Sequence, residues 1–300
     1  MTAPWLMVIA SLLFAVMGVC VKLASAQYGA GEIVLYRSLV GLVVMAAVMR
    51  WRGIGWRTRV PAMHFWRSAT GTTALCLWFV AIGGLPLATA MTLNYMSSVW
   101  IALFLIGGAV LLAPDRGGSG LVDGRLVAAV LAGFAGVALV LRPTIGQEQL
   151  WFGLVGLGSG LLAAAAYLQV TALGRIGEPG ERVVLYFCAM GVAFGAAIAL
   201  STGGLRAHTA LGLALLAAIG ALATLAQWMI TLAYGSGATL GIAALQYLGI
   251  VFSYLLGIVV FGERLTLLSG LGVLLIIAAG VAATLLRPRP RSDIVGPPES

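Results

Sequence analysis

Charged side chains are scarce in this sequence: only 9% of its 300 residues are charged, and only nine of them are acidic. A soluble domain carries about 25% charged residues and about 45–50% apolar ones, whereas 61% of this chain is apolar. A soluble fold of this length could not bury so much apolar surface, because a large share of any folded surface faces water. The composition therefore excludes a soluble globular protein and indicates that most of the chain faces lipid.

Residues that build metal sites, disulfide frameworks and nucleophilic catalysts are also few. The three cysteines, Cys20, Cys76 and Cys188, all fall in apolar stretches and are interpreted as small buried hydrophobes. The two histidines, His64 and His208, fall in or near expected loops, far from any cysteine pair. The sequence has no HExxH, Walker A or GxSxG pattern. We therefore predict that the protein is not an enzyme, holds no cofactor or metal, and has no ATP-binding module.

Long apolar stretches, by contrast, recur along the whole chain. A membrane-spanning helix needs about 20 mostly apolar residues. The stretches lack the period-two alternation of a membrane barrel. A signal peptide is the alternative for the first stretch, but Met1–Pro4 has no basic side chain and the apolar run is long for a signal core. We predict an all-α membrane protein with ten transmembrane helices, at Ala3–Ala26, Gly31–Met49, Ala62–Gly83, Leu87–Leu111, Arg125–Leu141, Trp151–Leu173, Glu181–Ser201, Ala210–Ala233, Thr239–Phe261 and Leu265–Leu286.

The distribution of basic residues predicts the orientation of these helices. Five arginines crowd the connection around residues 50–67, and three follow the last helix at residues 287–291. Short loops rich in Arg and Lys stay in the cytoplasm, so ten helices with both termini cytoplasmic place both clusters inside. The net charge of +8 is thus a topology signal. A nucleic-acid partner is not expected, because the aromatic residues lie in the spans and not among the arginines.

The two halves of the chain resemble each other faintly. The matches occur in the same order in both halves: Val34-Leu35-Tyr36 with Val184-Leu185-Tyr186, Trp78 with Trp228, and Asn94-Tyr95 with Gln246-Tyr247. We interpret residues 1–144 and 145–288 as two five-helix repeats, followed by a disordered tail at 289–300. Because five is odd, the second repeat must cross the membrane in the opposite sense. This gives two inverted-topology repeats, an arrangement suited to alternating access.

These features resemble the drug/metabolite transporter superfamily, in its ten-helix branch with two five-helix repeats. The residues that carry the resemblance are Arg37, Gln246-Tyr247, the Gly262-Glu263-Arg264-Leu265 stretch and Ala279-Gly280-Val281. Within that superfamily the chain is most similar to the YddG-type exporters of aromatic and other amino acids. The resemblance implies an exporter of small metabolites in the bacterial inner membrane.

Polar and aromatic side chains inside the spans are the candidates for substrate binding. Polar groups at membrane depth are costly and need partners. One interpretation is a shared cavity near the midplane, formed by the first, third, fourth, sixth, eighth and ninth predicted helices. The other is interhelical glue for the amides and plain packing for the aromatics. The candidate substrate-binding residues are Trp78, Asn94, Tyr95, Ser98, Tyr167, Gln169, Gln227, Trp228, Gln246 and Tyr247.

Charged residues near the spans receive mostly structural interpretations. Lys22 could attract a substrate carboxylate or extend to the lipid headgroups. Glu32 and Arg37 are expected to form a local ion pair. Small multidrug transporters of the superfamily that the chain resembles rely on a buried glutamate in their first helix. The first predicted helix here has no acidic residue, so the resemblance disfavours a proton-coupled multidrug antiporter. A phosphate-bearing solute would call for paired buried basic residues, and we expect none at mid-span.

The sequence thus predicts a facilitative exporter of amino acids, including aromatic ones, or of similar small metabolites. Another metabolite class or a drug, such as a purine or a sugar derivative, is the main rival. A membrane-embedded transferase would need catalytic acids at the interface, and Asp115, Asp123 and Glu148 form no convincing group. A structural or receptor role fits poorly with two duplicated halves.

Overall fold

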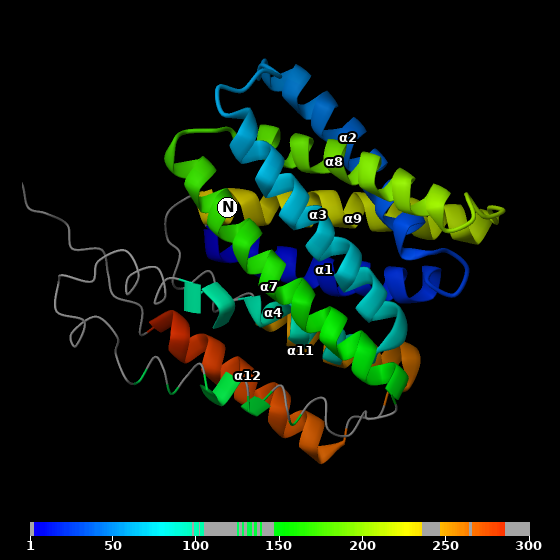
Figure 1. The fold of residues 1–300 in the computed structure, drawn as a ribbon, viewed down its shortest axis with the longest axis vertical. Coiled ribbons are helices and arrows are strands. Elements are labelled where there is room, and N and C mark those ends of the chain that lie inside the picture. Colours follow the sequence, from blue (N-terminus) through cyan, green and yellow to red (C-terminus); the bar gives the residue numbers. More distant parts are fainter. Residues whose placement is uncertain are drawn as a thin grey trace, which may run out of the picture.

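The described part of the chain is helical and connected by short loops (Figure 1). A computed structural model describes residues 3–97, 99–101, 103–104, 125, 128, 131–133, 135–136, 139, 147–235, 247–263 and 266–285. The helices within these ranges are α1 (Ala3–Ala24), α2 (Ala30–Arg52), α3 (Pro61–Gly84), α4 (Leu87–Tyr95), α7 (Gln147–Arg175), α8 (Gly180–Ser201), α9 (Ala210–Gly235), α11 (Leu248–Phe261) and α12 (Leu267–Leu285). The predicted tail at 289–300 and most of the predicted helix Arg125–Leu141 lie outside the described residues.

Five of these helices are long and apolar enough to cross a membrane. They comprise Trp5–Ala24, Ala30–Arg52, Gln149–Arg175, Gly180–Ser201 and Ala210–Ala233, and shorter apolar helices lie at Leu248–Phe261 and Gly270–Ala279. Helix α3 has 24 residues but carries more polar side chains, among them His64 and Arg67. The protein is therefore an all-helical, multi-pass membrane protein.

Glycine ends two of the helices close to the predicted positions. Helix α2 stops at Gly53 (φ 67°), whose N–H bonds back to the helix, and α11 stops in the same way at Gly262 (φ 61°). Both glycines adopt the left-handed conformation, which is costly for any residue with a Cβ. Pro61 begins α3, where its missing N–H leaves no helical hydrogen bond unmade.

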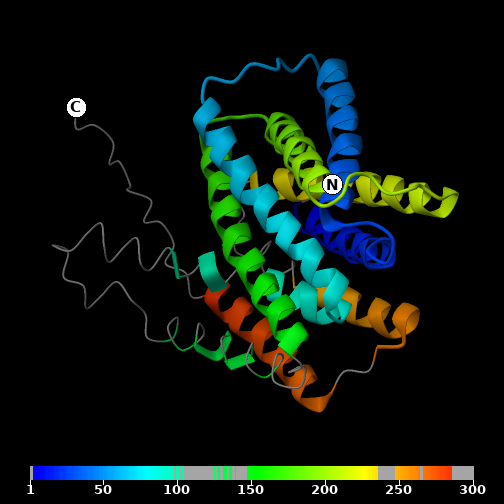
Figure 2. The same cartoon turned by 45° about the vertical axis from the view of Figure 1, so that its right-hand side comes forward.

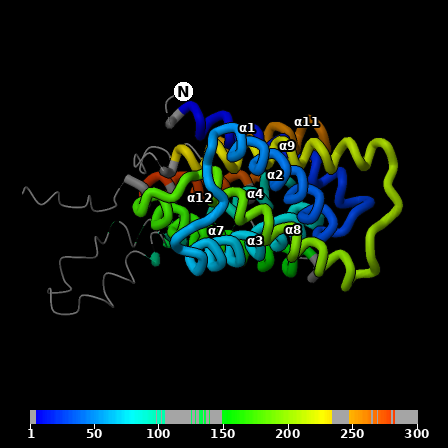
Figure 3. Tube along the Cα trace, turned by 90° about the horizontal axis from the view of Figure 1, so that it is seen from above, coloured from blue at the N-terminus to red at the C-terminus, as the bar shows by residue number. Residues whose placement is uncertain are grey.

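Three helix pairs form the body of the molecule: α2 packs on α8, α3 on α7, and α1 on α9. Figure 2 shows α3 and α7 running side by side, with α12 at the edge opposite α2 and α8. Seen from above, α1, α9 and α11 lie on one side and α3, α7 and α8 on the other (Figure 3). Helix α4 contacts helices of both groups, and all nine of its residues are buried.

Helices α2 and α8 approach each other unusually closely, at glycines. A Cβ added at Gly195 would lie 2.5 Å from the backbone nitrogen of Leu35, and one at Gly41 would lie 2.6 Å from Sγ of Cys188. The side-chain oxygen of Ser38 fills the space at Gly191 in the same way. Small residues let helix backbones come this close and maximise van der Waals contact in lipid.

Polar contacts tie the loops together at both ends of the bundle. At the first end, which comprises loop 53–60 and the α7–α8 connection, Glu178 accepts hydrogen bonds from Thr58 (2.8 Å) and Arg182 (2.9 Å) and contacts His64 (3.2 Å). At the second end, which comprises the α1–α2 connection, loop 202–209 and the residues after α11, Lys22 pairs with Glu263. The Glu263 carboxylate also accepts the Leu87 backbone N–H at 3.0 Å.

Candidate functional site

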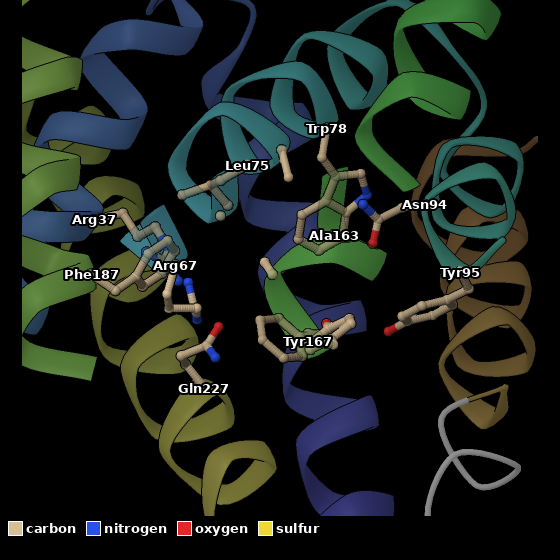
Figure 4. A pocket seen from close by; sticks show the side chains of 14 residues that line it. Arg37, Arg67, Leu75, Trp78, Asn94, Tyr95, Ala163, Tyr167, Phe187 and Gln227 are labelled. Atoms are coloured by element: carbon tan, nitrogen blue, oxygen red, sulfur yellow. The ribbon is translucent and has the colours of Figure 1, made fainter. Parts of the chain in front are cut away.

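A cavity lies where α1, α3, α4 and α7 meet α2, α8 and α9 (Figure 4). The volume open to a water molecule is about 60 Å³, room for a few waters. The second and seventh predicted helices were not among those expected to form the cavity, but Arg37 of α2 and Phe187 of α8 both line it.

One face of α3 supplies much of the wall. Arg67, Gly71, Ala74, Leu75 and Trp78 all line the cavity, and their spacing of three and four residues places them on one helical stripe. This pattern explains why Arg67 and Trp78, three turns apart on α3, both line the cavity.

Five of the ten predicted substrate-binding residues line this cavity. They are Trp78, Asn94, Tyr95, Tyr167 and Gln227. Figure 4 shows Tyr95 and Tyr167 reaching into it from α4 and α7. Asn94 also donates a hydrogen bond from Nδ2 to Ser159 Oγ at 3.0 Å, so its amide both faces the cavity and joins α4 to α7.

Trp78 forms the apolar part of the site together with Phe14. Their rings pack edge to face, with centroids 6.1 Å apart and planes inclined by 69°. The Trp78 side chain is 6% exposed, and within the described residues its indole N–H has no hydrogen-bond partner. A buried indole donor facing a cavity is available to a polar ligand atom.

The remaining predicted residues do not line the cavity or lie outside the described ranges. Gln169 follows Tyr167 by two positions, which turns it about 200° around α7. Trp228 lies one position after Gln227 and packs under the Arg52 guanidinium. The distance from Cζ of Arg52 to the centroid of the Trp228 ring is 5.3 Å. Tyr247 is buried in the apolar core. Ser98 and Gln246 lie outside the described residues.

Two buried arginines face the cavity, although no pair of buried basic residues was expected at mid-span. Arg37 and Arg67 are each 3% exposed. Both guanidinium carbons lie over the Phe187 ring, 5.0 Å and 4.5 Å from its centroid. Arg67 was assigned to the basic connection because of its arginine neighbours, although it falls within the predicted helix Ala62–Gly83, and α3 carries it into the bundle. The signal that could have found it is the stripe that Arg67 shares with Trp78.

The described carboxylates have partners elsewhere in the molecule. Glu32 contacts the Arg206 backbone N–H (3.2 Å) and His208 (3.5 Å), so the predicted Glu32–Arg37 pair is wrong. Lys22 pairs with Glu263 and Leu85 and does not extend alone toward headgroups. The cavity lining therefore combines aromatic surface, amide groups and two cations, with no acidic side chain among its described residues.

No family model matches this sequence. Pseudopaline exporters named CntI from two strains of Pseudomonas aeruginosa are 30% and 31% identical to it, over 277 and 278 residues. Each alignment covers 92% of this chain and 94% of the exporter. A riboflavin transporter of Rhizobium johnstonii is 28% identical over 228 residues, covering 75% of this chain and 70% of that protein.

A solved crystal structure superposes on this fold with a TM-score of 0.67 at 20% identity, covering 95% of this chain and 96% of the other. At that identity the likeness concerns the fold alone. The full-length match to the exporters, together with apolar helices around an internal cavity, determines the family. The chain belongs to the family of small-molecule membrane transporters that includes the pseudopaline exporter CntI.

Proposed function

We propose that the protein exports amino acids, including aromatic ones, or closely similar metabolites across the bacterial inner membrane. The observation that carries the proposal is a buried cavity that joins Trp78, Tyr95 and Tyr167 to the amides of Asn94 and Gln227. Aromatic surface with a few fixed polar groups suits an amphipathic organic solute. The relatives named as a pseudopaline exporter and a riboflavin transporter also support a small organic cargo.

Alternating access is the proposed mechanism, with ten spans arranged as two inverted repeats, 1–144 and 145–288. The packing supports this arrangement. If each half is shifted onto the other, α1 corresponds to α7, α2 to α8 and α3 to α9. The α3–α7 contact then corresponds to the α9–α1 contact, and α2 meets its own counterpart in α8. This is the pattern that a two-fold relation between the halves requires.

The α2–α8 crossing supports the same relation at residue level. Gly41 lies against Cys188, and Gly191 lies against Ser38. Each of these four residues has its counterpart 150 positions away, in line with the Val34-Leu35-Tyr36 and Val184-Leu185-Tyr186 match. Arg37 and Phe187 are also 150 positions apart, and they are in contact.

Transport in proteoliposomes tests the proposal. Uptake of radiolabelled phenylalanine, leucine and glutamate is measured for the wild type, Trp78→Ala and Asn94→Ala, with and without an imposed pH gradient. We expect saturable uptake of at least one of them that ignores the gradient. We expect Trp78→Ala to lower it about tenfold, because it removes a large aromatic contact.

Trp228→Ala is the matched control, because that indole lies away from the cavity and should leave uptake close to the wild-type rate. Riboflavin and adenine are assayed alongside. Failure of all three amino acids, with uptake of either of these two by folded protein, would replace the amino-acid proposal with another metabolite class. A rate that follows the pH gradient would contradict a facilitative mechanism.

A further inference from the structure

The two cavity arginines carry charge that the described protein does not neutralise. Neither guanidinium forms a described ion pair or hydrogen bond, and each Nε is buried without a partner. Taking an isolated cation out of water costs several kcal/mol even after the protein relaxes around it. Charged side chains inside a membrane protein that face a cavity usually mark the path of a ligand.

The surroundings hold both guanidinium groups in place and leave them open to the cavity. Both stack on the face of Phe187, an attraction between a cation and an aromatic ring that leaves the N–H groups at the guanidinium edge available. The Arg67 head group also folds back against Gly71, where a Cβ would collide with its Nη1. Glycine at that position therefore makes room for the arginine.

The acidic side chains that the structure describes are engaged at the ends of the bundle. Glu32, Glu178, Glu181 and Glu263 each contact another group there. None of these contacts reaches the cavity lining. Among the residues that the structure describes, no acidic side chain is left to meet Arg37 and Arg67, which leaves that role to a negatively charged ligand.

We propose that Arg37 and Arg67 form a dicarboxylate-binding site, and that the exported metabolite is an amino acid derivative with two carboxylates and an apolar body. This inference rests on the proposed function and names the substrate class of the same cavity. A planar guanidinium binds a carboxylate through two parallel hydrogen bonds, and two of them match two carboxylates. The apolar body would lie between Trp78 and Tyr167, across the cavity from the arginines (Figure 4), in a conformation whose cavity is larger than the volume of about 60 Å³ seen in this one.

A matched ligand series tests the inference on the purified full-length protein. The probes are N-carboxymethyl-L-phenylalanine with two carboxylates, L-phenylalanine with one, and L-phenylalaninamide with none. Phenyl phosphate is included as an oxyanion of a different kind. Dissociation constants are measured by calorimetry in detergent. We expect each carboxylate to tighten binding about tenfold, because each would form charge-assisted hydrogen bonds to a guanidinium group.

Variants then assign the effect to the two arginines. Arg37→Gln and Arg67→Gln should each weaken N-carboxymethyl-L-phenylalanine about tenfold or more and leave L-phenylalaninamide unchanged. Arg67→Lys should recover only part of the loss, because an ammonium lacks the planar fork. Gly71→Ala should weaken the dicarboxylate while keeping the charge, by displacing the Arg67 head group. Arg50→Gln, an exposed arginine of the same helix as Arg37, is the control and should bind like the wild type.

The outcomes separate this inference from the proposed function. Equal binding of the three phenylalanine probes overturns the dicarboxylate site and leaves amino-acid export standing. Tighter binding of phenyl phosphate than of the dicarboxylate overturns the carboxylate assignment. Absence of binding by every phenylalanine probe removes both the inference and the amino-acid proposal. The wild-type series decides the matter even where an arginine variant fails to fold.

Discussion

Glu178 joins three side chains, those of Thr58, His64 and Arg182, at the first end of the bundle. Burial acts to raise the pKa of this carboxyl, but hydrogen bonds from Thr58, Arg182 and His64 together outweigh it and hold the pKa below its ordinary value of 4.5. A carboxyl whose pKa is depressed by folding stabilises the folded state above its unfolded pKa. That contribution is lost as pH falls through the lower, folded value.

We therefore expect the detergent-solubilised protein to lose stability at acidic pH, and we call this part of its stability–pH curve the acid limb. The unfolding temperature should fall as pH drops below about 4.5. Glu178→Gln should lower the unfolding temperature at neutral pH and flatten this limb. Thr58→Val removes one donor and should move the limb to higher pH. Thr70→Val, whose hydroxyl bonds only within its own helix, should leave it unchanged. An identical limb in Glu178→Gln would show that another group is responsible.

Single residues also show where sequence reasoning reaches its limit. Trp78 and Asn94 are recognisable because polar and aromatic groups in mid-span need a reason to be there. Arg67 was missed because, in sequence, it continues a run of loop arginines. The predicted helix Ala62–Gly83 already contained Arg67, and the helical stripe that Arg67 shares with Trp78 is what shows that its side chain turns inward. Which of two neighbours such as Gln227 and Trp228 lines the cavity depends on how the helix is rotated about its axis, and the composition does not reveal that rotation.

At the scale of elements, α2 and α8 make a close backbone contact. We expect Gly195→Ala to destabilise the protein by about 1–3 kcal/mol, because the added Cβ meets the backbone of Leu35 and the helices must separate. Gly270→Ala is the control, because a Cβ there has nothing within 4 Å. Chemical or thermal unfolding in detergent measures both. Equal stability of the two variants would contradict the close crossing.

Most helix positions were predictable, because about 20 apolar residues in a row and Gly or Pro at their ends are strong local signals. Helix α2 extends only three residues past its predicted end, to Arg52, and α9 two, to Gly235. Helix α4 differs, since it ends at Tyr95 in the middle of the predicted Leu87–Leu111 stretch, at a turn at Met96. The described residues beyond it, up to 104, are helical again. Nothing in the apolar pattern marks that interruption.

At the scale of the whole molecule, the two ends of the bundle should face opposite sides of the membrane. The first end carries the arginine-rich loop, so the positive-inside rule predicts that this end faces the cytoplasm. In a cysteine-free background, Trp56→Cys and Leu205→Cys introduce single exposed thiols at the first and second ends. A membrane-impermeant maleimide should label position 205 in intact spheroplasts and position 56 only after lysis. The reverse pattern would invert the orientation.

The close crossing of α2 and α8 has a consequence for how such a molecule can move. Helices whose backbones interlock at glycines cannot slide past one another without collision. The crossing would then act as a fixed pivot, and the other helices would tilt about it. Arg37 and Phe187 lie on these two helices and line the cavity. The cargo would thus be bound where the helices move least, and the largest movements would occur at the two ends of the bundle, which would open alternately.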